Sequence, residues 1–382
     1  MTFSPTEARY LEAQVRQDLH RKMVFLGGPR QVGKTTLALR VLGSAEGYLN
    51  WDIAAHREAI LRREFPVGKL WVFDEIHKYA RWRNFLKGLY DDHAVAKRLG
   101  QAAPDILVTG SARLDLLRRG GDSLQGRYHY LRLHPLSVAE LGLETQGEME
   151  DLLRLGGFPE PYFGQSDVEA RRWSRAYRER LVREDVASLT QVRELDQLEL
   201  LALRLPALVA SPLSLHALAE DLQVAFKTVR RWLQILDRLY ALFQLPPLGG
   251  PTLRALKKAQ KHYHYDWTLV QDKGPRFENF VACHLLKWVH FRVDTRGEDV
   301  QLRYFRDTDG REVDFVMLQD TKPTHLIECK WRDQAPDKGL RYLARKYPDA
   351  QAWQLSAEGQ KDVLTPGGVR LAPALTFLRS LC

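Results

Sequence analysis

Apolar residues follow two recurrent patterns along this chain: short continuous runs, and longer segments with apolar positions at helical spacing. Runs at residues 23–27, 69–73 and 105–109 have the length and composition of buried strands. Helical segments accompany them, including an amphipathic one at residues 7–19 and another at about 82–90. Strands alternating with helices predict a parallel sheet that is covered on both faces. We therefore expect an α/β domain over residues 1–150.

The first predicted strand leads directly into a glycine-containing loop of fixed spacing. Glycines let the backbone aim its N–H groups at a phosphate chain, and the next helix presents its positive N-terminal end to the same anion. Lys34 is placed to reach the β- and γ-phosphates of ATP, and Thr35 is placed to hold Mg²⁺. A plain glycine turn before a helix is the alternative, which the complete spacing argues against. The loop consists of Gly28, Pro29, Arg30, Gln31, Val32, Gly33, Lys34, Thr35 and Thr36.

Polar residues end the next two runs. Asp74 and Glu75 close one of them, and an acid at a strand end helps to hold Mg²⁺ in P-loop enzymes. We assign that role to Asp74, and we assign Glu75 to orient and deprotonate the attacking water. A solvated acid pair is the alternative, but the phosphate loop upstream favours the catalytic interpretation. Thr109 and Ser111 end the following run, where a hydroxyl could sense the γ-phosphate or simply cap a helix.

Two arginines near the end of this domain are candidates for an arginine finger. Such a residue stabilises the transferring phosphate from a neighbouring subunit. Arg113 and Arg127 have suitable positions, and Arg127 precedes an alternating strand at residues 128–133. Either one could instead be an ordinary surface charge.

Composition narrows the class of protein. The 382 residues suggest two or three domains, and a hydrophobic content of 45% suffices for packed cores. The net charge of +9 and pI near 9.4 favour an anionic partner, most plausibly nucleic acid. Three scattered cysteines indicate neither a disulfide framework nor a zinc cluster. With no apolar run of membrane-spanning length and no signal peptide, we expect a cytoplasmic protein without membrane contact.

Residues 151–250 contain a predicted helical connector and then a helix-turn-helix. The connector, at 151–205, has a sparse apolar face that includes Trp173, Tyr177 and Leu189. Ser214 is a plausible N-cap for the first helix of the helix-turn-helix. The second helix, from Phe226, has an apolar face and a basic face, as in helices that read DNA. An interdomain adaptor of the same fold is an equally weighted alternative. The candidate nucleic-acid contacts are Lys227, Thr228, Arg230 and Arg231.

A basic cluster follows this unit, and aromatic residues are interleaved with it. It comprises Lys257, Lys258 and Lys261, with Tyr263 and Tyr265 close behind. The cluster could follow a phosphate backbone, or it could belong to an ordinary surface strand.

The last third of the chain contains a second set of chemically suggestive residues. An Asp-Gly turn at 307–311 predicts a hairpin between strands at 302–306 and 312–317. Glu328 and Lys330 share one face of the next strand, and Asp314 could join them. Two carboxylates can bind Mg²⁺, and a lysine can position water for attack on a phosphodiester. Glu278, on a preceding helix, could add a ligand. A surface strand can produce such a pattern by chance.

Together these motifs resemble those of prokaryotic AAA-type (AAA+) ATPases that carry a C-terminal domain of unknown function. The resemblance rests on residues 28–36, 74–78, 109–111 and 124–127, and on Gly156 to Glu160. It implies an AAA+ core at 1–150, a helical lid at 151–205, a winged helix at 206–250 and a nuclease-like domain at 251–382. Asp314, Glu328 and Lys330 resemble the PD-(D/E)xK nuclease core. The resemblance also implies a homo-oligomer, most plausibly a hexameric ring.

Two functions remain open from the sequence. The first is an ATP-hydrolysing, DNA-binding motor that uses ATP and Mg²⁺. The second is a regulatory switch, in which ATP occupancy controls partner binding and the C-terminal domain binds without cleaving. DNA-stimulated ATP turnover distinguishes the two functions.

Overall fold

A computed structural model describes residues 9–110, 124–186, 195–249 and 259–382 of the chain. Contacts between residues divide the chain into two compact units, one covering residues 2–134 and the other residues 135–382. Several sequence candidates lie outside the described residues: Ser111, Arg113, Leu189, Lys257 and Lys258.

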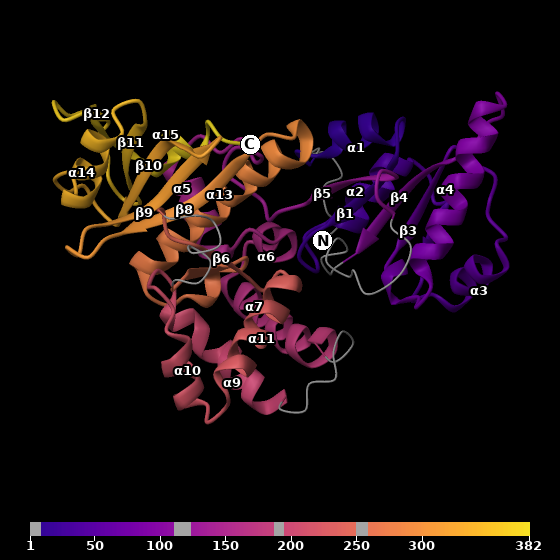
Figure 1. The fold of residues 1–382 in the computed structure, drawn as a ribbon, viewed down its shortest axis with the longest axis horizontal. Coiled ribbons are helices and arrows are strands. Elements are labelled where there is room, and N and C mark those ends of the chain that lie inside the picture. The colour runs from indigo at the N-terminus through magenta and orange to yellow at the C-terminus, as the bar shows by residue number, and fades with distance from the viewer. Residues whose placement is uncertain (1–8, 111–123, 187–194, 250–258) are drawn as a thin grey trace. The chain divides into compact units, whose positions relative to one another are not determined.

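The N-terminal unit alternates strands and helices, as the sequence predicts (Figure 1). The helix that begins at Trp82 continues two turns past the predicted end at Tyr90, because Ala94, Ala96 and Lys97 beyond it are good helix formers. The elements are α1 (Glu12–Leu19), β1 (Met23–Gly27), α2 (Lys34–Leu42), β2 (Tyr48–Asn50), α3 (Ala54–Arg62), β3 (Leu70–Asp74), the 3₁₀ helix η1 (Ile76–Lys78), α4 (Trp82–Arg98), β4 (Asp105–Gly110) and β5 (Tyr128–Arg132).

The five strands described in this unit form one parallel sheet in the order β2-β3-β4-β1-β5. In that order β4 lies between β1 and β3. Thr109 on β4 pairs in register with Leu26 of β1 on one side and with Asp74 of β3 on the other. The phosphate loop, the Asp74 carboxylate and the Thr109 hydroxyl therefore meet at the carboxyl edge of the sheet.

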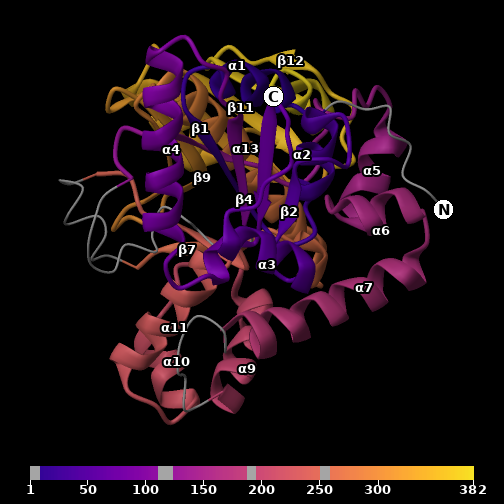
Figure 2. The ribbon, with the colours of Figure 1, turned by 90° about the vertical axis from the view of Figure 1, so that its right-hand side faces the viewer.

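Helices cover both faces of the sheet. On one face, Trp82, Phe85 and Leu86 of α4 pack in a buried cluster with Phe25 of β1 and Phe73 of β3. On the other, α1 lies against β1 and α2 against β3 and β4, and Figure 2 shows α2 and α4 on opposite sides of the strands. Strand side chains alternate between faces, so both faces of these short strands are apolar. This explains the continuous apolar runs in the sequence.

The C-terminal unit combines a helical region with a second sheet. Its helical elements include η2, which is a π-helix. The elements are α5 (Gln146–Leu155), α6 (Pro159–Gly164), α7 (Asp167–Arg180), η2 (Leu181–Val186), α9 (Leu195–Arg204), η3 (Leu205–Leu208), α10 (Leu215–Asp221), α11 (Phe226–Arg238), β6 (Leu242–Leu245), β7 (Lys261–His264), η4 (Trp267–Leu269), α13 (Lys273–Arg296), β8 (Val300–Arg306), β9 (Glu312–Gln319), β10 (Lys322–Lys330), α14 (Lys338–Lys346), β11 (Gln351–Ser356), β12 (Val363–Leu364), β13 (Val369–Pro373) and α15 (Ala374–Leu378).

The predicted helix-turn-helix is present as α10 and α11, followed by a pair of strands. The Ser214 side chain accepts a hydrogen bond from Ala217 N and caps α10. β6 pairs with β7 in antiparallel fashion. That pairing crosses the domain boundary predicted at residue 250, because β7 lies in the stretch that we assigned to the C-terminal domain.

The second sheet has six strands in the order β12-β13-β11-β10-β9-β8. β8 and β9 form the predicted hairpin, with β10 antiparallel to β9 and parallel to β11. Leu340 and Leu343 of α14 pack with Leu326 of β10. Trp288 of α13 contacts His325, the neighbouring residue on β10, with ring centroids 6.3 Å apart. Because adjacent strand residues point to opposite faces, α13 and α14 cover opposite sides of this sheet.

No helix within the described ranges has the length and apolar character needed to cross a membrane.

Candidate nucleotide site and the C-terminal carboxylate cluster

The phosphate loop is held by contacts that tolerate only glycine at its first position. Gly28 has φ 149°, and a Cβ there would lie 2.2 Å from the Leu133 carbonyl oxygen. Gly33 caps α2 with φ 99°, in the left-handed region that favours glycine. The buried Val32 side chain anchors the middle of the loop. These features explain the spacing of the two glycines.

Lys34 begins α2 and is buried, and its ammonium turns back onto the loop. Its Nζ donates hydrogen bonds to Gly28 O at 3.0 Å and to Pro29 O at 2.6 Å. These carbonyl groups hold the charge at the loop, next to the N-terminal end of α2. A nucleotide phosphate would compete with the carbonyl groups for the ammonium, and the stronger charge-assisted bond would form with the phosphate.

Asp74 is hydrogen-bonded through both carboxylate oxygens, and each of them accepts from a neighbour. Oδ2 accepts from Thr35 Oγ1 at 2.9 Å and from Tyr48 Oη at 2.6 Å, while Oδ1 accepts from Thr109 Oγ1. The contact with Thr35 brings a hydroxyl and a carboxylate oxygen to one point. Oxygen donors of this kind are the ligands that Mg²⁺ prefers, so Thr35 and Asp74 fit a magnesium site.

Thr109 and Tyr48 have clear positions in this network. The Thr109 hydroxyl donates a hydrogen bond to Asp74, so it helps to fix the position of this carboxylate. Tyr48 was not predicted from the sequence. Burial, followed by the hydrogen bond to Asp74, raises the pKa of Tyr48, so the phenol stays a donor. The sequence signal that could have identified Tyr48 is its position on the short strand that precedes the strand ending in Asp74.

Glu75 follows Asp74 directly and has a left-handed backbone, with φ 54°. Its Oε2 lies 3.6 Å from His77 Nε2 and 3.7 Å from Lys78 Nζ. Burial lowers the pKa of His77, so its ring is neutral near pH 7 and Lys78 supplies the positive charge. A carboxylate in this position can accept a proton from water beside the phosphate site.

Arg127 is engaged within its own unit. Its Nε donates to Asp91 Oδ1 at 2.8 Å and its Nη2 donates to Asp91 Oδ2 at 3.2 Å. The guanidinium is therefore held to α4 by both carboxylate oxygens. To act in a neighbouring subunit's site, Arg127 would have to leave Asp91.

The proposed DNA-reading helix, α11, has the predicted division of faces. Val229, Trp232 and Leu233 are buried, whereas the basic side chains Lys227, Arg230 and Arg231 are exposed, and Thr228 is half-buried. The Arg230 guanidinium lies 4.7 Å from the centre of the Phe226 ring. The exposed basic residues therefore lie together near the start of one helix.

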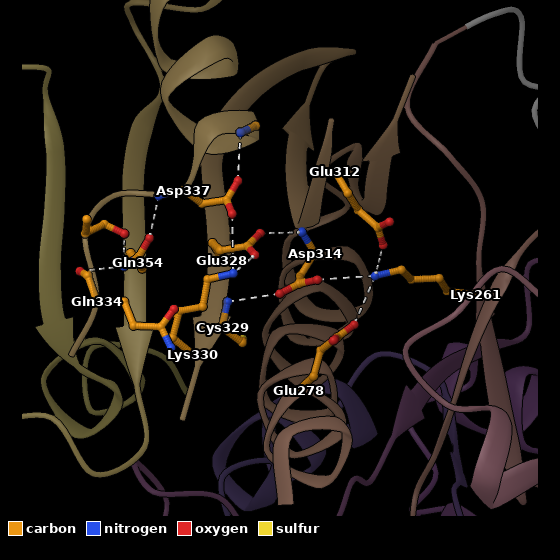
Figure 3. Close-up of polar contacts among 12 residues, drawn as sticks. Lys261, Glu278, Glu312, Asp314, Glu328, Cys329, Lys330, Gln334, Asp337 and Gln354 are labelled. Carbon is orange, nitrogen blue, oxygen red and sulfur yellow. Dashed lines mark hydrogen bonds and ion pairs between the residues drawn. The ribbon is translucent and has the colours of Figure 1, made fainter. Parts of the chain in front are cut away.

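In the second sheet, Asp314, Glu328 and Lys330 do lie together, as strand alternation predicts (Figure 3). Lys330 Nζ donates to Glu328 Oε1 at 2.7 Å, and Glu328 Oε2 accepts from Asp314 N at 3.3 Å. Asp314 Oδ2 accepts from Cys329 N at 3.0 Å. Burial and the charge of Asp314 raise the pKa of Glu328 to about 9. The residues are brought together, and their carboxylate oxygens already have donors in the protein.

A buried lysine completes this cluster and corrects one prediction. Lys261, with an exposed fraction of 0%, pairs with Glu278, Glu312 and Asp314. Tyr263 and Tyr265 are also buried. The prediction that Lys261 lies on a surface strand or follows a phosphate backbone is therefore wrong: the side chain faces the carboxylates of α13 and β9. Among the residues with described positions, no three His, Cys, Asp or Glu side chains are arranged to hold a metal ion.

Fold and site together define a P-loop nucleotide-binding domain in the N-terminal part of the chain. Residues 20–142 match the family described as an AAA domain. Residues 146–272 and 273–372 match two further families, each described as a domain of unknown function (DUF8612 and DUF4143). The chain thus carries an AAA domain followed by two such domains.

Two related proteins align with almost the whole chain. The uncharacterized protein Rv2008c of Mycobacterium tuberculosis is 26% identical over 407 residues, covering 95% of this chain and 86% of the relative. The uncharacterized protein Mb2031c of Mycobacterium bovis has the same identity and coverage.

Among solved structures, AMPPCP-bound DnaA from Aquifex aeolicus has a TM-score of 0.31 at 14% identity, covering 59% of this chain and 86% of that one. A RuvB variant from Thermotoga maritima has a TM-score of 0.30 at 18% identity, covering 61% of this chain and 89% of that one. Scores this low support no inference about function.

Proposed function

We propose that this protein hydrolyses ATP at the Gly28–Thr36 loop and couples the turnover to DNA bound by α11, acting as an oligomeric motor. One observation supports the ATPase most strongly: Lys34, Thr35, Asp74 and Glu75 converge at one edge of a parallel sheet, with Thr35 and Asp74 in hydrogen-bond contact. The arrangement supplies a phosphate cradle, a metal-binding pair and a base.

The chain's own residues divide the work of hydrolysis. The loop N–H groups and Lys34 bind the phosphates, because both present positive charge to the same place. Thr35 and Asp74 would hold Mg²⁺, which neutralises charge on the phosphates when it is bound. Glu75 orients the attacking water and accepts its proton, while Lys78 and the neutral His77 hold the carboxylate in place.

The DNA part of the proposal rests on charge. The chain carries +9 overall, and the exposed basic residues of α11 concentrate part of that charge on one helix. Such residues bind phosphates or base edges when a helix enters a groove. Cleavage by Asp314, Glu328 and Lys330 is left out of the proposal, because the oxygens of both carboxylates are bound by donors in the protein.

An ATPase assay with single-stranded, duplex and branched DNA tests the coupling. We expect at least one DNA form to raise ATP turnover several-fold. A variant with Lys227, Arg230 and Arg231 changed to alanine should lose this stimulation and keep its basal rate. The matched control removes three exposed charges from another helix, with Lys338, Arg341 and Arg345 changed to alanine.

The regulatory switch is the second candidate. The C-terminal carboxylate cluster favours it, because donors in the protein already bind the oxygens of Asp314 and Glu328. A domain that binds without cleaving suits a switch in which ATP occupancy controls partner binding. Slow ATP turnover that no DNA form accelerates, with DNA or protein binding that depends on bound ATP, would select the switch over the motor.

A further inference from the structure

The C-terminal carboxylate cluster is built around one ammonium group. Lys261 Nζ lies 2.7 Å from Glu312 Oε1, 3.1 Å from Glu278 Oε1 and 3.2 Å from Asp314 Oδ1. A lysine ammonium has three N–H donors and no acceptor. Each donor can therefore meet one carboxylate, and the three come from α13 and β9 while the lysine comes from β7 (Figure 3).

The charges in this cluster make a cation necessary. Burying a carboxylate without a partner is very costly, so a buried acid either finds a cation or takes up a proton. Burial alone would lower the pKa of Lys261, but the charges of Glu278, Asp314 and Glu312 outweigh burial and raise it, so the lysine stays charged. The Lys261 ammonium also lies 5.6 Å from the centre of the Tyr304 ring, a second favourable contact for a cation.

Other donors in the protein also bind the carboxylate oxygens of this cluster. Asp314 Oδ2 accepts from Cys329 N, and Glu278 Oε1 accepts a further bond from Tyr263 Oη at 2.7 Å. Glu328 is bound through both oxygens, by Lys330 Nζ and Asp314 N. The metal ligands implied by a nuclease-like domain, Asp314 and Glu328, therefore do not fit a divalent ion here.

We propose that the Lys261 ammonium is the permanent cation of this carboxylate site and occupies the place of a divalent metal. A metal and an ammonium cannot share the same oxygens, because their like charges repel at such distances. The C-terminal domain is accordingly a metal-independent module that does not cleave nucleic acid. Removing the lysine leaves Glu278, Glu312 and Asp314 around the point that its ammonium held. Their oxygens, now 2.7 to 3.2 Å from that point, would move inward to bind Mn²⁺ or Mg²⁺ there.

Mn²⁺ binding to the full chain without nucleotide tests this proposal, with bound metal measured by electron paramagnetic resonance. The parent should show no Mn²⁺ site that depends on Asp314. Lys261→Ala should bind Mn²⁺ at least about tenfold more tightly than the parent, and its thermal midpoint should rise with added Mn²⁺. Adding Asp314→Asn to that variant should remove both effects. Lys346→Ala, which removes an exposed lysine of α14, controls for the change in net charge.

Two results would overturn the proposal. One is Mn²⁺ binding by the parent that Asp314→Asn abolishes, since the metal would then coexist with the lysine. This measurement does not require Lys261→Ala to fold. The other is a folded Lys261→Ala, verified by circular dichroism, that gains no Mn²⁺ affinity. Neither outcome depends on the P-loop, so ATP turnover can succeed or fail independently.

Discussion

Glu75, the proposed catalytic base, has a backbone conformation that few non-glycine residues adopt. Its φ of 54° lies in the left-handed region, which costs a non-glycine residue roughly 1 kcal/mol or more. The backbone bond from Glu75 N to Thr109 O, at 3.1 Å, helps to hold this turn at the end of β3. The strained turn directs the chain away from the sheet immediately after Asp74, so the two adjacent carboxylates meet different neighbours.

Two substitutions at the nucleotide site should fail in different ways. Lys34→Ala should lower ATP affinity by about 100-fold, because the ammonium meets phosphate charge in the bound ground state. Glu75→Gln should keep ATP binding but lower turnover by about 100-fold or more, because the amide cannot accept a proton from water. Fluorescent-nucleotide binding and phosphate release measure the two effects. Parent-rate hydrolysis by Glu75→Gln would show that another group is the base.

Histidine burial predicts how the protein responds to acid. In α13, His284 Nε2 accepts from Val138 N at 3.1 Å, so Nδ1 carries the proton and donates to Phe280 O at 2.8 Å. Burial lowers the pKa of His284 to about 3. The unfolded chain, with its ordinary pKa near 6.5, therefore binds one more proton between these values. Stability from this group is present above pH 6.5 and is lost as the pH falls toward 3, by about 1.4 kcal/mol per pH unit.

Thermal unfolding at pH 7 and pH 5 tests this expectation. The midpoint should fall on acidification, and His284→Gln should reduce the fall. His20→Gln, at a side chain that is 81% exposed, should leave the fall unchanged. His262 and His264 add to the parent's acid sensitivity, because burial lowers their pKa values to about 4 and about 3. Equal acid sensitivity in all three proteins would contradict the role of His284.

At the level of elements, α11 provides a prediction about salt. Changing Lys227, Arg230 and Arg231 to alanine should weaken DNA binding and flatten its dependence on salt, since each lost phosphate contact removes roughly one released counterion from the slope. Fluorescence anisotropy at several salt concentrations measures both quantities. The Lys338, Arg341 and Arg345 triple variant serves as the control. Unchanged affinity and slope would make the helix-turn-helix an adaptor.

The positions of some site residues could be predicted from the sequence, and those of others could not. Strand alternation sufficed to place Glu328 beside Lys330, and the fixed loop spacing sufficed for Lys34 and Thr35, because both depend on neighbours in sequence. Lys261 could not be predicted in this way. Its cluster of basic and aromatic residues looks like a surface, and only the pairing of β7 with β6 and its packing beside α13 bury it. Tyr48 was missed for the same reason, since its partner Asp74 lies on another strand.

At the scale of the whole molecule, assembly of subunits can be tested through Arg127 and Asp91, the residue with which it forms an ion pair. If Arg127 acts on a neighbouring subunit, Arg127→Ala should lower ATP turnover at least about tenfold without changing ATP affinity. Asp91→Ala is the matched variant, because it breaks the same ion pair but leaves the arginine, and it should retain turnover. Light scattering with ATP should show an oligomer, for which we expect a hexamer. A monomer that stays active at high dilution would exclude a finger in trans.

Lys261 also bears on how this chain could have been inherited. The two matched families divide the C-terminal unit after residue 272, yet Lys261 lies before that point and Glu278, Glu312 and Asp314 lie after it. Recombination there would leave one fragment with a buried cation and the other with three neighbouring carboxyl groups that have lost their cation, and each would be destabilised. The two stretches should therefore be inherited as a single unit. In related chains, replacement of the acidic residues after residue 272 should accompany replacement of the lysine at position 261.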